Sequence, residues 1–231
     1  MHVDLNAFFV RCEEIKNPSL EGKAVAIGSE GRGGIVSTCS YSARKYGISS
    51  GMPMFQAKKL CPFLKIIHED FHFYELMSNE FYSYCKQFTS QISIVSIDEC
   101  YLDITKEMSH IINLNLFLNN FQKGLFSKLK LKCSIGVGPT LFLAKMGSDL
   151  KKPMGISIIQ KTDVSRLLYP RDVSTYFGIG KKSIPRLYDA KIYTIGDLAN
   201  LVFNEPEKAK QMFGKRYYSF IEELKGESSS L

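Results

Sequence analysis

Two adjacent carboxylates within an apolar, strand-like run constrain the fold of this chain more than any other feature. Asp98 and Glu99 lie in the segment 93–103, whose other residues are largely β-branched or apolar. An uncompensated charge in such surroundings costs several kcal/mol. A bound cation is the simplest compensation, so this run predicts a site that holds positive charge.

A third carboxylate, Asp4, stands alone in a second strand-like stretch, 3–9. No His or Cys clusters around these acids in the sequence, and hard oxygen ligands of this kind favour Mg²⁺ or Mn²⁺ over zinc. Such carboxylates commonly hold two ions about 3.5–4 Å apart and serve phosphoryl transfer. The sequence therefore predicts a two-metal site at Asp4, Asp98 and Glu99, with an exposed acidic turn as the alternative.

The order of strand and helix periodicities predicts an α+β fold. Strand-like runs fall at 3–9, 92–97, 101–104 and 133–137, and amphipathic helices are expected at 70–88 and 111–129. The resulting β-α-β-β-α-β order predicts a ferredoxin-like antiparallel sheet with both helices on one face and the other face open to substrate. The second and third strands would form a hairpin that carries the paired acids near its tip, beside the strand of Asp4.

Residues 12–69 carry strand, turn and helix signals of their own, so we expect a small inserted lobe. Its glycine-rich run 28–34 lacks the Gly-Lys-Ser/Thr ending of a P-loop, which favours a hairpin connection. Tyr41 and Arg44 stand three apart at a strand-to-helix transition. On a helix this spacing lets a phenol and a guanidinium grip a triphosphate from one side, although ordinary solvated helix faces share the pattern.

Positive charge and glycine gather after the last predicted sheet strand. Lys145 and the pair Lys151-Lys152 would lie close to the carboxylates if the predicted topology holds, with surface solvation as the alternative for Lys151. From residue 162 the chain changes to short helices and turns. Residues 177–187 are interpreted as helix, glycine hairpin and helix, an arrangement that lets backbone N–H groups approach a nucleic-acid phosphate. A plain turn between helices is the alternative.

The composition fits one substantial core and a smaller second one. The chain has 231 residues, 45% of them hydrophobic, and its 30 Lys and Arg outnumber its 23 Asp and Glu to give a formal charge of +7. A polyanionic partner suits this balance, as does a merely soluble basic enzyme. Six cysteines form no CxxC pair, and no apolar stretch of about 18 residues or signal-peptide pattern occurs. We expect an intracellular soluble protein with reduced thiols.

Taken in order, these stretches resemble the Y-family DNA polymerases, the translesion enzymes, and in particular their bacterial polymerase IV and UmuC-like branch. The resemblance spans essentially the whole chain. Its motifs are Asp4-Leu5-Asn6-Ala7-Phe8-Phe9, Glu13, the run 36–44, Gly51-Met52-Pro53, Ser96-Ile97-Asp98-Glu99, Ala144-Lys145, Lys152-Pro153 and Gly178-Ile179-Gly180. The shared order of the motifs is what makes the resemblance specific.

The resemblance implies a template-directed polymerase that adds deoxynucleotides to a primer 3′ end with low processivity, in DNA damage tolerance. According to this resemblance, the catalytic residues Asp4, Asp98 and Glu99 bind two Mg²⁺ ions, which Mn²⁺ can replace. The backbone carbonyl of Leu5 adds a further metal ligand. Phe9 matches the steric gate, a ring beneath the sugar that would collide with the 2′-hydroxyl of a ribonucleotide. By sequence alone, Phe9 could equally be a core residue.

The remaining site residues follow from the same resemblance. The side chains that match contacts to the triphosphate of the incoming nucleotide are Thr38, Tyr41, Arg44 and Lys152. Gly178, Gly180, Lys181 and Lys182 match the glycine hairpin that holds the DNA backbone. The implied domains are a palm (1–11 and 70–160), fingers (12–69) and a helical thumb with a helix-hairpin-helix (161–231).

The resemblance also sets expectations about partners. Primer-template DNA and deoxynucleoside triphosphates are the implied ligands, with no membrane, in a monomer located in the bacterial cytoplasm and at the nucleoid when active. The family's little-finger domain and the tail that binds the sliding clamp have no counterpart in this sequence. The resemblance therefore suggests a truncated catalytic core whose DNA binding is weak and sensitive to salt.

Two departures from the family pattern stand out. Asn6 replaces an acid that is common in polymerase IV, but the UmuC-like branch tolerates Asn there. Thr140-Leu141, within Gly138-Pro139-Thr140-Leu141, stands where the family often has Asn-Lys, which puts local contacts to DNA or phosphate in doubt.

Two other classes of protein compete with the polymerase interpretation. A noncatalytic DNA-binding or regulatory protein with the polymerase shape would be expected to lack a carboxylate, and all three are present. A nucleotidyl cyclase would share a two-metal palm, but the glycine hairpin after the palm argues against it.

Overall fold

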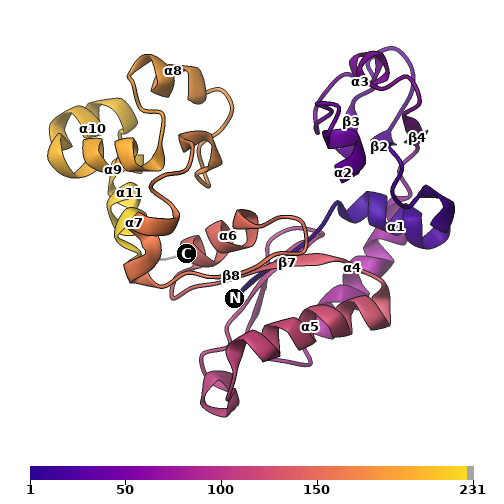
Figure 1. The fold of residues 1–231 in the computed structure, drawn as a ribbon, viewed down its shortest axis with the longest axis horizontal. Coiled ribbons are helices and arrows are strands. Elements are labelled where there is room, and N and C mark those ends of the chain that lie inside the picture. Colours follow the sequence, from indigo (N-terminus) through magenta and orange to yellow (C-terminus); the bar gives the residue numbers. More distant parts are fainter. Residues whose placement is uncertain (228–231) are drawn as a thin grey trace. The chain divides into compact units, whose positions relative to one another are not determined.

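The computed structural model describes residues 1–227 and divides the chain into two compact units (Figure 1). We call residues 4–133 the 4–133 unit, and residues 1–3 together with those from 134 onward the 134–231 unit. Strand β1 (His2–Leu5) contributes residues to both units.

The 4–133 unit contains α1 (Phe8–Lys16), β2 (Val25–Gly28), β3 (Val36–Cys39), α2 (Tyr41–Arg44), α3 (Met54–Leu60), β4 (Lys65–Ile67), α4 (Phe71–Cys85), β5 (Ile92–Ile94), β6 (Glu99–Leu102) and α5 (Leu114–Leu129), with 3₁₀ turns at Pro18–Leu20 and Glu107–His110. The 134–231 unit contains nearly all of β7 (Cys133–Val137), then α6 (Leu141–Leu150), β8 (Ile156–Ile158), α7 (Val164–Leu167), α8 (Ile184–Asp189), α9 (Ile195–Asn204), α10 (Pro206–Phe213) and α11 (Arg216–Lys225), with 3₁₀ turns at Lys161–Asp163 and Val173–Thr175.

The larger sheet has the strand order β5-β6-β1-β7-β8. Its first four members, taken along the chain with α4 and α5, give the β-α-β-β-α-β order, so the predicted ferredoxin-like α+β class is confirmed. The sheet is not wholly antiparallel, because β8 adds a strand that pairs parallel to β7, with Ile135 opposite Ile156. Helix α6 makes the crossover that a parallel pair requires.

The first predicted strand ends sooner than its apolar pattern indicated. Strand β1 stops at Leu5, and Ala7 adopts a left-handed conformation (φ 48°, ψ 51°) immediately before α1 begins at Phe8. Phe9 therefore lies on a helix rather than on a strand. The long helices are also shorter than expected, since α4 ends at Cys85 and a 3₁₀ turn precedes α5.

Helices α4 and α5 pack on one another through aromatic side chains. Tyr84 of α4 donates its hydroxyl to the carbonyl of Phe121 on α5 at 2.8 Å, and the two rings meet edge-on at 5.2 Å. Phe88, just after α4, adds a tilted contact to the Phe121 ring at 4.8 Å. The apolar stripes predicted for both helices therefore meet in the core of the 4–133 unit.

The expected lobe contains a second sheet of order β3-β2-β4. Strands β2 and β3 pair antiparallel, so the glycine-rich segment between them is the predicted hairpin connection. Successive side chains of β2 point to opposite faces. Ala26 joins the core formed with α3, while Val25 and Ile27 pack with Val10 of α1.

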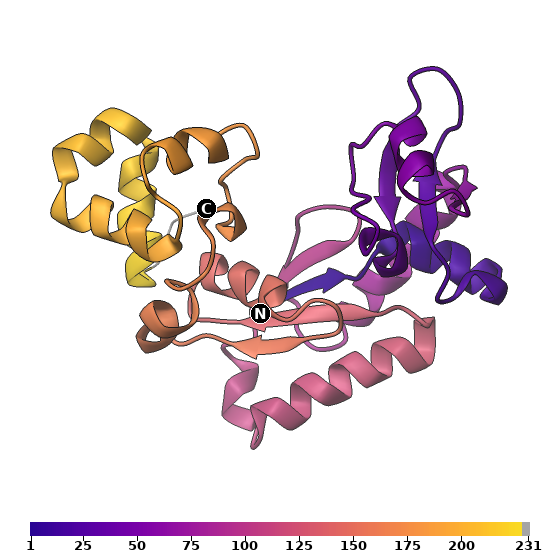
Figure 2. The same cartoon turned by 45° about the horizontal axis from the view of Figure 1, so that its top comes forward.

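Helix α6 lies directly on β7 and β8 in both ribbon views (Figures 1 and 2). A Cβ added at Gly136 of β7 would lie 1.9 Å from the carbonyl oxygen of Ala144 on α6, so only glycine permits this separation. His2 of β1 is hydrogen-bonded through Nδ1 to the Ser148 hydroxyl of α6 at 2.8 Å.

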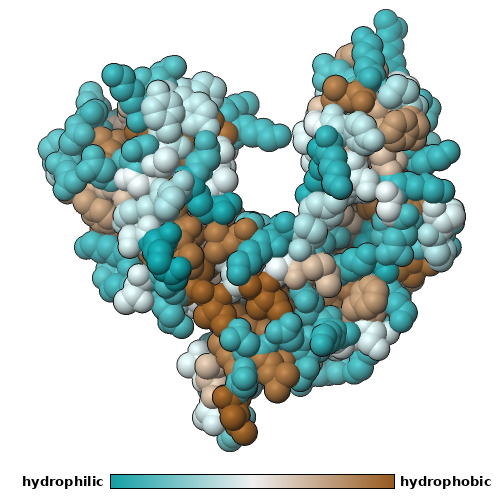
Figure 3. Space-filling view, in the orientation of Figure 1, coloured by the Kyte–Doolittle hydropathy of each residue, from teal (hydrophilic) through white to brown (hydrophobic). Residues whose placement is uncertain are grey.

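The surface of the 4–133 unit carries an apolar region around the 3₁₀ turn Glu107–His110 and the start of α5 (Figure 3). Met108, Ile112 and Leu116 are exposed there. Within residues 1–227, no helix has the length and apolar character needed to cross a bilayer.

Candidate active site

The paired acids lie at the tip of the β5–β6 hairpin. Asp98 immediately precedes β6, and Glu99 is its first residue. The hairpin is antiparallel, with Ile94 opposite Cys100, and the backbone N–H groups of Val95 and Ser96 donate to the Glu99 carbonyl at 3.1 and 3.3 Å. The predicted position of the acids on the hairpin is therefore confirmed.

Strand β1 brings Asp4 beside this tip. The backbone N–H of Leu5 donates to the carbonyl oxygen of Asp98 at 2.9 Å, and β1 is the sheet neighbour of β6. Asp4 is 9% exposed. The backbone of β1, which carries Asp4, thus lies beside the hairpin tip that carries Asp98 and Glu99, as the sequence predicted.

The two faces of β6 differ in burial. Cys100 and Leu102 are buried, whereas Glu99 and Tyr101 are half-buried, which is the alternation of a strand covered on one face. The covering element is α4, because the Cys100 sulfur lies 3.9 Å from that of Cys85. Glu99 consequently points away from the face covered by α4.

Three hydroxyl groups hold the turn that carries the acids. Ser96 donates to Oδ1 of Asp98 at 2.7 Å. From α4, Ser78 donates to the carbonyl of Ile97 at 2.6 Å, and Tyr82 donates to the carbonyl of Ser96. Ser78 and Tyr82 belong to none of the sequence motifs, although a pair of hydroxyls four residues apart on a helix expected to cover the hairpin was an available signal.

Charge and burial set the protonation of the groups around the turn. Burial, with a smaller contribution from the negative charge of Asp98, raises the pKa of Tyr82 to about 12, so its hydroxyl is a proton donor at neutral pH. Burial also raises the pKa of the Cys133 thiol, and the negative charge of Asp4 adds to that effect. Both thiol and phenol are therefore neutral near the carboxylates.

The donor set suits a hard divalent cation. Asp4, Asp98 and Glu99 offer carboxylate oxygens, and Leu5 offers a carbonyl oxygen. Among residues 1–227, no three His, Cys, Asp or Glu side chains are placed so that they could hold a metal ion together. Like charges repel at short range, so neighbouring carboxylates converge only where a cation or a shared proton offsets the repulsion. The chemistry of the ligands fits Mg²⁺, and the coordination itself remains a prediction.

Two of the predicted triphosphate contacts on the lobe, Tyr41 and Arg44, lie together. Ser40 caps α2 by accepting from the backbone N–H of Ala43 at 3.1 Å. The guanidinium carbon of Arg44 lies 4.6 Å from the centre of the Tyr41 ring, so the two side chains share one side of this turn. Thr38 precedes them on β3, opposite Ile27.

Phe9, the predicted gate, is half-buried on α1. Its ring stacks on Tyr74 of α4 at 4.4 Å with an interplanar angle of 12°, and Phe71 meets it edge-on at 5.9 Å. Tyr74 is fixed in turn because its hydroxyl donates to the buried Glu13 at 2.9 Å. The ring of Phe9 is thus supported from one side by residues that do not belong to α1.

Lys145 and Lys152 belong to the 134–231 unit. Asp149 joins them, with one carboxylate oxygen 2.8 Å from Lys152 Nζ and the other 3.9 Å from Lys145 Nζ. Lys145 also lies 6.0 Å from the centre of the Phe177 ring, which links α6 to the glycine turn.

The segment interpreted as helix-hairpin-helix departs from expectation on its amino-terminal side. A single 3₁₀ turn, Val173–Thr175, stands where a helix was predicted, and α8 follows the glycines. Gly178 has φ +92°, a conformation that other residues rarely adopt. The exposed Lys181 and Lys182 follow it in the loop.

A partly buried ion pair supports this glycine turn. Both Nη atoms of Arg216 lie 2.9 Å from the carboxylate oxygens of Glu223, and Tyr176 donates its hydroxyl to the same carboxylate at 2.7 Å. Arg216 Nη2 also donates to the carbonyl of Phe177 at 3.4 Å. A cavity of about 240 Å³ lies between the turn, α10 and α11.

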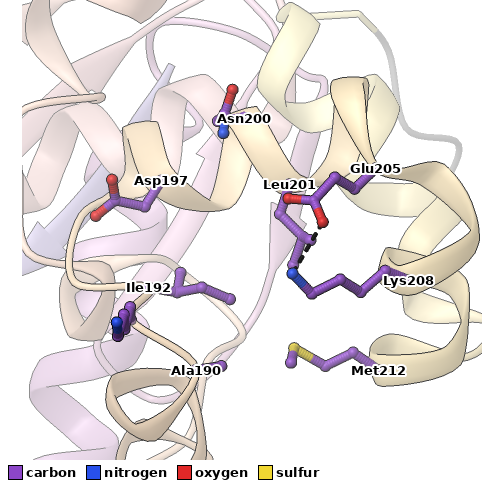
Figure 4. Close-up of a pocket in the computed structure, with 9 residues that line it drawn as sticks. Ala190, Ile192, Asp197, Asn200, Leu201, Glu205, Lys208 and Met212 are labelled. Atoms are coloured by element: carbon purple, nitrogen blue, oxygen red, sulfur yellow. Dashed lines mark hydrogen bonds and ion pairs between the residues drawn. The ribbon is translucent and has the colours of Figure 1, made fainter.

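A second cavity, of about 120 Å³, lies between the end of α8 and helices α9 and α10 (Figure 4). Both of its acids are already engaged. Glu205 pairs with Lys208 at 2.8 Å, and Asp197 accepts from the backbone N–H of Thr194 at 2.8 Å. This cavity offers no unengaged acid for chemistry.

Comparison with known proteins gives three findings. Residues 3–149 match the impB/mucB/samB family. The chain is 41% identical over 217 residues to DNA polymerase IV of Oceanobacillus iheyensis and 43% identical over 201 residues to DNA polymerase IV of Bacillus anthracis. These alignments cover 93% and 86% of the chain but 52% and 48% of the relatives, so the chain spans about half the length of the curated relatives it matches.

Solved structures show the same likeness. DinB from Sulfolobus solfataricus superposes with a TM-score of 0.85 at 29% identity, over 96% of this chain and 65% of that one. The insertion ternary complex of Dbh DNA polymerase gives a TM-score of 0.86 at 28% identity, over 100% of this chain and 68% of that one.

Proposed function

Because the chain belongs to the impB/mucB/samB family, and thus to the Y-family polymerases that its motifs resemble, we propose that it is the catalytic core of a translesion DNA polymerase. It adds deoxynucleotides to a primer 3′ end under the direction of a template, with low processivity, in DNA damage tolerance. The supporting observation is the 2.9 Å hydrogen bond from Leu5 to Asp98, which sets the strand of Asp4 beside the tip that bears Asp98 and Glu99.

Asp4, Asp98 and Glu99, with the Leu5 carbonyl, hold two Mg²⁺ ions in this proposal, and Mn²⁺ can replace them. When bound, such ions activate the primer hydroxyl and stabilise the charge on the leaving pyrophosphate. The carboxylates orient the reacting groups from a rigid pair of strands. Nucleotidyl transfer depends on such positioning more than on covalent chemistry by the protein.

The same proposal assigns the binding residues. Tyr41 and Arg44, already side by side on α2, grip the triphosphate together with Thr38 and Lys152. A guanidinium suits this role because it donates two parallel hydrogen bonds to phosphate oxygens. Phe9, stacked on Tyr74, lies beneath the sugar and excludes a 2′-hydroxyl.

Primer-template DNA is the proposed macromolecular partner. The glycine turn presents Gly178 and Gly180 to a backbone phosphate, with Lys181 and Lys182 adding charge. In this assignment residues 1–11 and 70–160 form the palm, 12–69 the fingers and 161–231 the thumb. We further propose that the protein is a monomer that acts in the bacterial cytoplasm on nucleoid DNA and binds a sliding clamp. The bacterial origin of its curated relatives supports the cytoplasmic location.

Single-nucleotide extension of a primer-template tests the function. The chain and its Asp98→Ala variant are compared at high enzyme concentration, low salt and saturating Mg²⁺, with circular dichroism as the control for folding. Extension by the parent and none by the folded variant is the expected result. Extension by both would refute the site, and binding of DNA without extension by either would favour the noncatalytic alternative.

A further inference from the structure

The acidic turn is held from the side of α4 as well as by its own hairpin. Ser78 and Tyr82 stand four residues apart on α4, so they project from the same face of the helix one turn apart. Ser78 donates to the carbonyl of Ile97 at 2.6 Å, and Tyr82 donates to the carbonyl of Ser96. Two consecutive carbonyls immediately before Asp98 are thus fixed by one helix.

These contacts are shielded from water. Ser78 is 4% exposed and Tyr82 is 7% exposed. A buried carbonyl that loses its donor costs roughly 1–3 kcal/mol, because no water replaces the lost hydrogen bond. The turn therefore has one favoured position relative to α4.

The contacts continue to the carboxylate itself. Tyr82 holds the backbone of Ser96, and the Ser96 hydroxyl donates to Oδ1 of Asp98 at 2.7 Å. The rotation of the Asp98 side chain is consequently linked to the Tyr82 hydroxyl through a single intervening residue. Neither Ser78 nor Tyr82 contacts the Glu99 face of the sheet, since α4 covers the face of Cys100.

We propose that Ser78 and Tyr82 are positioning residues for the metal site. From the face of the sheet that α4 covers, they set the position and orientation of Asp98. This inference rests on the proposed function, because it concerns the same carboxylates. Groups that orient a metal ligand from behind typically change metal affinity or activity by about 10- to 100-fold when removed. The hydroxyls act through the turn and take no part in the reaction.

Tyr82→Phe is the sharpest test because it removes one hydroxyl and keeps the ring. Tyr84→Phe is the matched control, since Tyr84 is a buried tyrosine on the same helix whose hydroxyl donates to the Phe121 carbonyl, on α5. Ser78→Ala and its conservative partner Ser78→Thr form a second pair, in which threonine restores the donor.

Two quantities are measured in the full chain with primer-template and a non-hydrolysable deoxynucleotide analogue present. Mn²⁺ affinity is followed by the electron paramagnetic resonance of the free ion. The Mg²⁺ concentration that gives half-maximal extension is then determined with ordinary nucleotide. We expect Tyr82→Phe and Ser78→Ala to weaken Mn²⁺ binding and to raise the Mg²⁺ requirement by about 10-fold or more, with excess Mg²⁺ restoring much of the rate.

The two hypotheses fail in different ways. If the parent binds Mn²⁺ and extends primers but Tyr82→Phe and Ser78→Ala match Tyr84→Phe in both measurements, the hydroxyls support only the fold and the inference is wrong. If the parent neither binds Mn²⁺ nor extends primers, the proposed function and the inference fall together. Recovery of affinity by Ser78→Thr supports the inference, and thermal unfolding of each variant checks that the native state is populated.

Discussion

The ring of Phe9 stacks almost parallel on the ring of Tyr74, with centroids 4.4 Å apart. The sequence left Phe9 as either a core residue or a gate for the sugar. Because Tyr74 is anchored to Glu13 and supports one side of a half-buried ring, the structure is compatible with packing and gating by the same side chain.

Removing this ring should relax the choice of sugar. We expect Phe9→Ala to raise the ratio of ribonucleotide to deoxynucleotide insertion by roughly tenfold or more, since a steric exclusion is lost. The variant should also lose about 2 kcal/mol of unfolding free energy, less than a fully buried Phe would. Tyr74→Phe keeps the stack and serves as the control. Equal discrimination by Phe9→Ala and parent would show that Phe9 is not the gate.

Gly178 should be more sensitive to substitution than Gly180. Gly178→Ala forces a side chain into φ +92° and places its Cβ 2.8 Å from Arg216 Nη2, whereas a Cβ at Gly180 meets nothing within 4 Å. We expect Gly178→Ala to lower the free energy of unfolding by about 1–3 kcal/mol and Gly180→Ala to change it little. Urea denaturation measures both, and equal effects would show that the conformation of Gly178 places no special constraint on the turn.

The lysines of the glycine turn should set the salt dependence of DNA binding. Each phosphate contact that is lost should make the slope of log K against log salt shallower by about 0.9. We expect this change for Lys181→Gln and for Lys182→Gln, measured by fluorescence anisotropy with duplex DNA. Lys123→Gln, an exposed lysine on α5, is the charge-matched control. The same slope of log K against log salt in all three variants would show that residues other than Lys181 and Lys182 contact the DNA.

Tyr84 should make the protein less stable at alkaline pH. Burial raises its pKa from 10.0 to about 12, so the folded state keeps a proton that the unfolded state releases. This stability is fully present below pH 10 and is lost as the pH rises toward 12, by about 3 kcal/mol for a shift of this size. Tyr84→Phe should flatten the decline in unfolding free energy between pH 9.5 and 11.5, roughly in proportion to that contribution.

The control for this titration is Tyr218→Phe, at a tyrosine that is 62% exposed. Its pH dependence of unfolding should follow that of the parent. A decline as steep in Tyr84→Phe as in the parent would assign the alkaline sensitivity to other groups.

The sequence was sufficient to predict four of the five strands of the larger sheet and the place of the acids on its hairpin. Asp98 and Glu99 interrupt an apolar run, and such an interruption locates a hairpin tip without knowledge of tertiary contacts. The pairing of Tyr41 with Arg44 was predictable for a similar reason, because helical spacing alone determines which side chains meet.

Other features depend on tertiary contacts. Nothing in the sequence indicates that Ala7 adopts a left-handed conformation. The apolar pattern therefore predicts a strand that continues to Phe9, whereas a helix begins at Phe8. Strand β8 is short, and its three residues are recognisable only by their pairing with β7. In the sequence, Ser78 and Tyr82 cannot be distinguished from other helix residues. Their role becomes visible only from their hydrogen bonds to the turn before Asp98.

The contact of Gly136 with α6 limits how this part of the sequence can evolve. Because a side chain at position 136 would overlap the backbone of α6, no single substitution of Gly136 can be accepted while α6 keeps its position. Any substitution would first have to be accommodated by a displaced helix, which would disturb the hydrogen bond between His2 and Ser148 as well. In a library of functional variants, substitutions at position 136 should therefore be rare, and those that occur should be accompanied by substitutions in α6.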